Sequence, residues 1–282
     1  MKIPGFLGGS HKVKPPNYDC QQTINYYIEK SENGTSKEQE PVALIPCPGQ
    51  ILAHMLSKGP VRGLHSTTNG PLVCVAGNGV YYLVQSASGV WSHTLFAVLT
   101  TTAGPVSICD GITNYWCGSL NTANIDSVII VDGSSQGILF EEGKTEVTQL
   151  NSGGNFQGSD WVTFQDGFFI FNKPGFPYAY FAEDPLQINA LDFVVVNLAS
   201  DVITRVISDH DILWFFGKKS TVIFQNTGGS GTQNTFAQIP GSLSTAGTNA
   251  PATVAQVSGQ LLWVANDARG NGRSSWLQAT GE

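Results

Sequence analysis

The side chains best able to do chemistry in this sequence are few and scattered. Asp209, His210 and Asp211 form the densest group of metal-ligating residues. Successive residues of a β-strand point to opposite faces, so an extended backbone would place the two carboxylates together and His210 on the other side. Because that geometry divides the triplet and no second ligand cluster follows, we expect neither a metal site nor any other cofactor.

Other catalytic patterns are incomplete. Gly228–Thr232 has the glycines of a phosphate-binding loop but lacks the following lysine, so a flexible turn is the simpler interpretation. Neither GxSxG nor HExxH occurs, and the remaining histidines stand singly. The adjacent carboxylates of Glu141–Glu142 and Glu183–Asp184 would point to opposite faces of a strand and could not flank one glycosidic bond. We therefore predict that the chain is not an enzyme. A carbohydrate-active propeller is the alternative, which saturable turnover of a glycan would favour.

Composition favours one large, turn-rich domain. The chain has 282 residues, of which 41% are hydrophobic and only 12% are charged, and it contains 32 glycines and 14 prolines. No apolar run is long enough to span a membrane, and Pro4 interrupts any signal-peptide core, so we expect neither export nor a membrane partner. The five cysteines form no CxxC motif, which favours reduced, buried thiols.

Charge is unevenly distributed along the chain. Residues 1–62 carry a net charge of +2, residues 63–204 carry −10, and residues 205–282 carry +1. An acidic surface repels phosphate backbones, so the middle region should not grip DNA or RNA. The alternative is that these carboxylates only keep a large protein soluble.

A strand–turn–strand pattern recurs five times, and these hairpin repeats are the strongest structural signal. In each repeat an apolar run meets a turn with Gly, Asn, Asp or Lys, and a second apolar run follows, which is typical of a β-hairpin. Aromatic pairs such as Phe215–Phe216 suit strands that are covered on both faces. The repeats occupy residues 73–83, 128–140, 162–171, 212–224 and 261–277.

The spacing of the repeats favours a β-propeller. Their turn glycines, from Gly77 to Gly270, are separated by 56, 34, 50 and 53 residues, close to the length of a propeller blade. The sequence thus predicts an all-β, propeller-like fold of repeated antiparallel sheets. An irregular β-sandwich is the alternative, since the interval of 34 is short. The sequence ends inside the fifth repeat, which leaves open a body that is incomplete, shortened or closed by another chain.

The first fifty residues differ from the rest. Lys12, Lys14, Pro15 and Pro16 follow a glycine-rich block, and a charged stretch at 29–40 reads as a solvent loop. Residues 42–45 should form a strand. We expect residues 1–50 to form an extended N-terminal arm with the first strands, and residues 51–282 to form the propeller-like body. Within that body residues 193–196 should form a strand, and residues 185–192 are compatible with a short helical turn.

Three N-terminal blocks resemble a known family. They are Phe-Leu-Gly-Gly-Ser at 6–10, Asn-Tyr-Asp-Cys-Gln-Gln-Thr-Ile-Asn-Tyr-Tyr-Ile-Glu at 17–29, and Leu-Ile-Pro-Cys-Pro-Gly at 44–49. In order and spacing they are similar to the opening of the packaged-DNA stabilisation proteins of short-tailed bacteriophages, also called tail hub or nozzle proteins. The resemblance covers roughly the first 80 residues by motif.

This resemblance implies a structural protein of the virion tail, assembled in the host cytoplasm. Its members are described as β-propeller proteins that form a ring, a homohexamer, beneath the portal and its adaptor protein. The ring would close the DNA channel after packaging, carry the tail needle and the tailspike or fibre proteins, and let genomic DNA pass without sequence-specific binding. The assembly interface would include the residues of the first two blocks, namely Phe6, Leu7, Gly8, Gly9, Ser10, Asn17, Cys20, Asn25 and Tyr26.

Under the same resemblance the acidic middle region gains a role. An acidic wall would let DNA slide, whereas basic side chains would retard it. We predict that part of residues 63–204 faces the channel, with Asp126, Asp132, Glu141, Glu142, Glu146 and Asp160 as candidates. The alternative function is a propeller that binds carbohydrate or protein, for which loop-tip aromatics and carboxylates should repeat in each blade.

Overall fold

The computed structural model describes residues 26–30, 42–46, 49, 52–116, 119–150, 154–196, 201–228, 235–257, 260–266 and 272–279. The chain divides into two compact units, residues 1–53 and residues 54–282. In the first unit β1 (Tyr26–Lys30) pairs antiparallel with β2 (Val42–Pro46), and Lys30 lies opposite Val42. The strand predicted at residues 42–45 is thereby confirmed.

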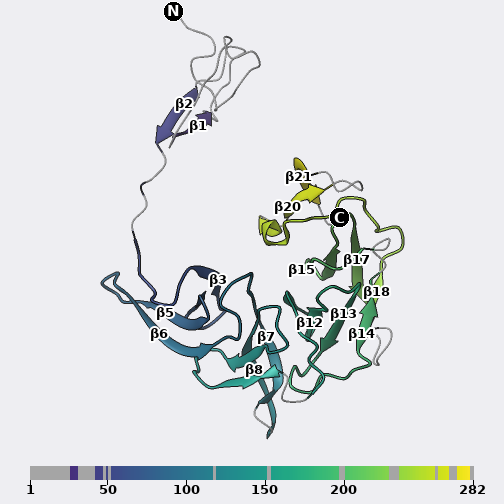
Figure 1. The fold of residues 1–282 in the computed structure, drawn as a ribbon, viewed down its shortest axis with the longest axis horizontal. Coiled ribbons are helices and arrows are strands. Elements are labelled where there is room, and N and C mark those ends of the chain that lie inside the picture. Colours follow the sequence, from purple (N-terminus) through teal and green to yellow (C-terminus); the bar gives the residue numbers. More distant parts are fainter. Residues whose placement is uncertain are drawn as a thin grey trace, which may run out of the picture. The chain divides into compact units, whose positions relative to one another are not determined.

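The described residues of the second unit form five antiparallel sheets, each made of strands consecutive in the sequence (Figure 1). The first sheet contains β3 (Val61–Ser66), β4 (Leu72–Ala76), β5 (Gly79–Gln85) and β6 (Trp91–Val98). The second contains β7 (Ser107–Trp116), β8 (Ser119–Val131), β9 (Ile138–Glu141) and β10 (Val147–Gln149).

The remaining three sheets follow in the same manner. The third contains β11 (Val162–Gln165), β12 (Phe168–Asn172), β13 (Tyr178–Ala182) and β14 (Phe193–Val195). The fourth contains β15 (Arg205–Asp209), β16 (Ile212–Phe216), β17 (Thr221–Asn226) and β18 (Phe236–Gln238). The 3-10 helix η2 (Pro251–Thr253) precedes the fifth sheet of β19 (Ala255–Val257), β20 (Gln260–Asn266) and β21 (Gly272–Ala279).

All five predicted hairpin repeats are antiparallel strand pairs, but they do not occupy equivalent places. Four of them join the second and third strands of a sheet, whereas the third repeat is β11–β12, the first and second strands. The turn that corresponds to the others lies between β12 and β13 and contains Gly175. This glycine is 42 residues after Gly133 and 42 residues before Gly217, so the short interval of 34 came from a shift by one strand.

Consecutive sheets pack face to face through apolar side chains. Val128 and Ile130 of β8 pack against the first sheet, while Ile129 and Val131 of the same strand pack against the third. In the fourth sheet Phe215 belongs to the core shared with the third sheet, and its neighbour Phe216 to the core shared with the fifth. The predicted double covering is therefore confirmed for Phe215–Phe216, and the second strands of the first four sheets, β4, β8, β12 and β16, are buried on both faces.

From the first sheet to the fourth, the first strand of each sheet lies beside the first strand of the next. β3 contacts β7, β7 contacts β11, and β11 contacts β15. Together with β19 we call these the inner strands. Four-stranded sheets that stack in chain order with their first strands adjacent are typical of a β-propeller, so each sheet is a blade. The all-β, propeller-like prediction is confirmed.

Two other local expectations can be compared with the structure. β14 confirms the strand predicted near residues 193–196. Residues 185–192 form two successive turns rather than a helix, since the backbone N–H of Gln187 donates to the carbonyl of Asp184 and that of Asp192 to Asn189. Within the described residues no helix is long and apolar enough to cross a membrane.

Candidate functional site

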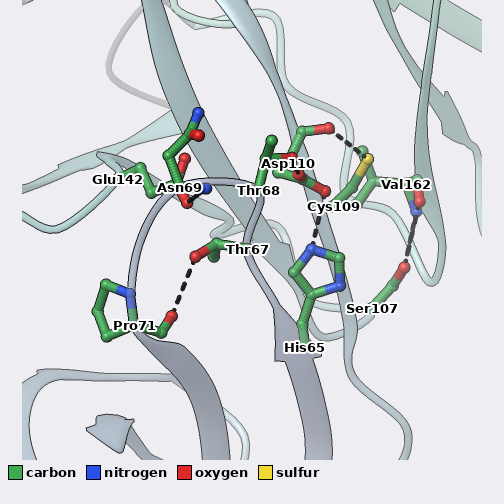
Figure 2. A network of polar contacts seen from close by, with 10 residues as sticks. All are labelled: His65, Thr67, Thr68, Asn69, Pro71, Ser107, Cys109, Asp110, Glu142 and Val162. Carbon is green, nitrogen blue, oxygen red and sulfur yellow. Dashed lines mark hydrogen bonds and ion pairs between the residues drawn. The ribbon is translucent and has the colours of Figure 1, made fainter. Parts of the chain in front are cut away.

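The inner strands are joined to one another by polar side-chain contacts, and these bridges form the candidate site. Between β3 and β7, His65 Nε2 donates to Asp110 Oδ1 at 2.8 Å (Figure 2). The hydroxyl of Thr68 donates to the other carboxylate oxygen of Asp110 at 2.7 Å. The hydrogen bond from His65 is the main reason why the pKa of Asp110 falls to about 2, and Thr68 adds to it. At neutral pH Asp110 is therefore ionised, and it accepts two hydrogen bonds.

The turn after β3 is held by two further carboxylates of the second blade. The backbone N–H of Asn69 donates to Glu142 Oε1 at 2.6 Å, and its side-chain amide donates to Asp126 Oδ2 at 3.1 Å. Figure 2 shows Glu142 beside Asn69 in this turn. A Cβ at Gly70 would lie 2.6 Å from Glu142 Cγ, so the close approach requires glycine there. The first and second blades are thus joined through three carboxylates.

Polar bridges continue between the next inner strands. The Ser107 hydroxyl on β7 bonds both backbone groups of Val162 on β11, accepting from its N–H at 3.1 Å and donating to its carbonyl at 3.3 Å. On β15, the backbone N–H of Ser208 donates to the Thr163 hydroxyl at 3.1 Å, and the hydroxyl of Ser208 donates to Gln165 Oε1 at 3.1 Å. Each bridge connects residues more than forty positions apart and fixes one blade against the next.

The last bridge involves the triplet at 209–211 and corrects the expected geometry there. Asp209 is buried at the end of β15 and accepts a hydrogen bond from Gln256 Nε2 on β19 at 2.5 Å. His210 and Asp211 have φ values of 49° and 61°, so they form a left-handed turn instead of an alternating strand. The expectation that both carboxylates share one strand face was wrong, because the chain reverses direction at this point.

A second polar path links the first two blades through the connector between them. The guanidinium of Arg62 donates to the carbonyls of Gly77, Thr101, Ala103 and Gly104 and to the Thr101 hydroxyl, at 2.7–2.8 Å. The hydroxyl and backbone N–H of Thr101 in turn donate to Asp132. Asp132 is buried, and hydrogen bonds from Ser134 and Thr101 outweigh the effect of burial and lower its pKa. The connector is therefore held at both ends.

The six acidic candidates occupy different environments. Asp126, Asp132 and Glu142 bond to groups of the first blade or its connector, as described above. Asp160 is half-buried and burial raises its pKa. Glu141 ends β9, and Glu146 is exposed just before β10. Whether any of them faces a channel stays a prediction.

Of the predicted assembly residues, Tyr26 is the one that the structure describes. Phe6, Leu7, Gly8, Gly9, Ser10, Asn17, Cys20 and Asn25 lie outside the described residues, and Tyr26 opens β1. The glycine-rich segment at 229–232 is also outside them. Of the cysteines, Cys74 and Cys109 are described, and both are free thiols whose pKa is raised chiefly by burial.

Sequence reasoning did not find the bridging residues His65, Asp110 and Arg62. Each partner is separated from the other by about 15 to 45 residues, so no local motif joins them. A usable signal was present, since polar residues interrupt the apolar sequence of each inner strand. Among the described residues, no cluster of three or more His, Cys, Asp or Glu could hold a metal ion.

A family model described as Phage_stabilise, bacteriophage P22 Gp10, β-propeller, matches residues 30–281. The search of curated proteins gave no match. The match begins after the first two N-terminal blocks, which are therefore outside its range.

Several solved structures are similar to this chain at low identity. Virginiamycin B lyase from Staphylococcus aureus is 9% identical over 85% of this chain and 70% of that chain, with a TM-score of 0.45. YCF48 bound to D1 peptide is 13% identical over 88% and 70%, with a TM-score of 0.45. Hsv2 from Kluyveromyces lactis is 8% identical over 86% and 75%, with a TM-score of 0.42.

Proposed function

Because this chain belongs to the family of the bacteriophage P22 Gp10 β-propeller, a family of phage tail structural proteins, we propose that it is one subunit of a ring in the virion tail. In this proposal six copies form a homohexamer below the portal and the adaptor protein. The ring closes the DNA channel after packaging, attaches the tail needle and the tailspike or fibre proteins, and conducts the genome at ejection.

The observation that carries the proposal is the family match, which spans β2 and all five blades. The polar bridges support it, because a subunit that bears mechanical load needs blades that do not slide. The His65–Asp110 pair and the Arg62 cluster each cross from one blade to the next or to its connector. The polar groups of these clusters hydrogen-bond to one another, so they hold the blades in fixed positions, as a scaffold requires.

Assembly of the purified full chain tests the ring. Mass photometry should give one dominant species of about six subunits, and negative-stain images should show a central hole. A protein that stays monomeric at micromolar concentration, alone and with its adaptor, would contradict the proposal. Turnover or saturable glycan binding by that monomer would favour the enzyme or binding-module alternatives.

The N-terminal arm can be tested separately. Replacing Phe6 and Leu7 together by Asp should abolish ring or virion assembly, because two apolar anchors would become charged. The matched control replaces Phe6 by Tyr and Leu7 by Met, which keeps apolar bulk and should assemble normally. Undiminished assembly of the double Asp variant would remove these two residues from the interface.

The channel-facing role of the acidic residues needs a transport measurement. Glu141 and Glu146 are suitable positions for this measurement because, among the described residues, neither carboxylate makes a hydrogen bond. Replacing both by Lys should slow DNA ejection from otherwise complete virions, since cations near the path would attract phosphates. Replacing both by Gln is the control and should change the rate much less. Equal ejection rates for the Lys variant and the wild type would show that these side chains do not face the DNA.

A further inference from the structure

A cavity of about 170 Å³ lies among the inner strands of the first four blades. Its lining includes Leu64 and His65 from β3, Ser107 from β7, Trp161 just before β11, and Arg205 at the start of β15. The volume corresponds to between five and six water molecules, taking about 30 Å³ for each. A small ion fits into this space, whereas a folded chain segment does not.

Among the described residues, Arg205 is the charged side chain of this lining for which the structure shows no polar partner. Its guanidinium carbon lies over the Trp161 ring, 3.7 Å from the ring centre, which is a cation–π contact. Within the described residues it makes no hydrogen bond or ion pair, and its Nε is buried without a partner. Burial lowers the pKa of Arg205 to about 10, so the side chain is charged at neutral pH.

The nearby acidic groups are already engaged. Asp110 is held by His65 and Thr68. Asp209, four residues along β15 from Arg205, is bonded to Gln256 and lies 3.0 Å from His210 Nδ1. Arg205 therefore differs from Arg62, whose guanidinium makes five hydrogen bonds to backbone and hydroxyl oxygens. A largely buried cation without such partners is costly unless a counter-charge accompanies it.

The two terminal amino groups of Arg205 remain accessible, since Nε is its only buried, unpartnered nitrogen. They form the two-pronged donor that matches a pair of oxygens on one anion. We propose that this cavity binds a small oxyanion, either phosphate or the carboxylate of a small molecule, through Arg205 held in place by Trp161. The Trp161 ring holds the guanidinium at the cavity. The site does not depend on whether the chain forms a hexameric ring.

Thermal unfolding of the full chain is the first test. In a phosphate-free buffer, added phosphate should raise the Tm in a saturable way, by about 3 °C once its concentration is ten times the Kd. Chloride at matched ionic strength should not reproduce the rise. A parallel titration with acetate distinguishes phosphate from carboxylate as the bound anion. An equal rise in Tm with acetate assigns the site to carboxylates as well, whereas no rise with acetate assigns it to phosphate. No rise with either oxyanion, or the same rise with chloride, would overturn the proposal.

Two variants separate a binding site from a structural arginine. Arg205→Met should keep the wild-type Tm without phosphate, or raise it, because removing a buried unpaired charge relieves its desolvation cost. The same variant should lose the phosphate response. The matched control Arg62→Met should lower the Tm through its lost hydrogen bonds but retain the full response. An Arg205→Met protein that keeps the response would overturn the proposal.

A crystallographic experiment gives an answer that does not depend on the variants. Crystals of the wild-type chain soaked in selenate should show an anomalous peak within hydrogen-bond distance of the Arg205 amino groups. The peak should weaken when phosphate is added in excess. An empty cavity beside occupied selenate sites elsewhere on the surface would overturn the assignment even if the solution data were favourable.

Discussion

Asp110→Asn tests whether the bridge between β3 and β7 stabilises the propeller. The replacement keeps the size of the side chain and one acceptor oxygen but removes the charge that holds His65 and Thr68. The pKa of Asp110 falls from 3.8 to about 2, and each unit corresponds to about 1.4 kcal/mol, which sets an upper bound of about 2–3 kcal/mol. The Asp110 side chain is 29% exposed, so solvent screening reduces the expected loss to about 1–2 kcal/mol.

The pH dependence has a definite sign. Because the folded-state pKa of Asp110 is depressed, its contribution is fully present above the unfolded value of 3.8 and disappears as the pH falls toward about 2. The difference in unfolding free energy between the wild type and Asp110→Asn should therefore be constant from pH 7 to pH 5. It should shrink between about pH 4 and pH 2.

Urea unfolding followed by tryptophan fluorescence at pH 7, 5 and 3 measures this difference. Glu146→Gln is the control, since it neutralises an exposed carboxylate of the same blade and should have little effect on stability. The reasoning is refuted if Asp110→Asn and Glu146→Gln unfold at the same urea concentration at pH 7. It is also refuted if the loss caused by Asp110→Asn is as large at pH 3 as at pH 7.

Three further changes follow from local geometry. Gly77→Ala should lower the free energy of unfolding by about 1–3 kcal/mol, because Gly77 has φ +54° and a Cβ would collide with the Lys58 carbonyl. The control is Gly143→Ala, at φ +77° in open space, which should lower the Tm less. Gly111→Ala should cost about 1–3 kcal/mol in urea unfolding, since its Cβ would press on aromatic rings of the third blade, and an unchanged midpoint would contradict this. The Cys109 thiol, whose pKa is raised by burial, should resist alkylation at pH 8 until urea unfolds the chain. Peptide mapping that finds it modified in the native protein would show that the site is open.

Much of the fold could be predicted because its signals are local. Four successive apolar residues, 128–131 of β8, require two covered faces, and both are present. The turn between β16 and β17 was predictable because Gly217 separates two apolar runs, residues 212–216 and 221–224. The third blade was harder, since its β11–β12 hairpin resembles the others while occupying a different place in the sheet. A hairpin pattern records that two strands pair and not where the pair lies in a blade.

The candidate site was less predictable for a physical reason. His65 and Asp110 are 45 residues apart, and neither has a neighbour in sequence that reveals the other. The triplet at 209–211 looked like one strand, but positive φ values at His210 and Asp211 turn the chain. Local sequence does not fix such a turn, because Asn, Asp and His adopt left-handed conformations only where the surroundings favour them.

The sequence by itself determined the all-β character, the positions of the strand pairs and the family resemblance of its N-terminal blocks, since these depend on short-range alternation and on motifs. Only the tertiary structure decided which carboxylates hold the neighbouring blade and that Arg205, within the described part of the chain, is left without a polar partner. The sequence alone does not distinguish Arg62 from Arg205, since both are arginines. Packing surrounds the first with oxygen atoms and the second with an indole ring and a cavity, because contacts between blades bring together residues that the chain order keeps apart.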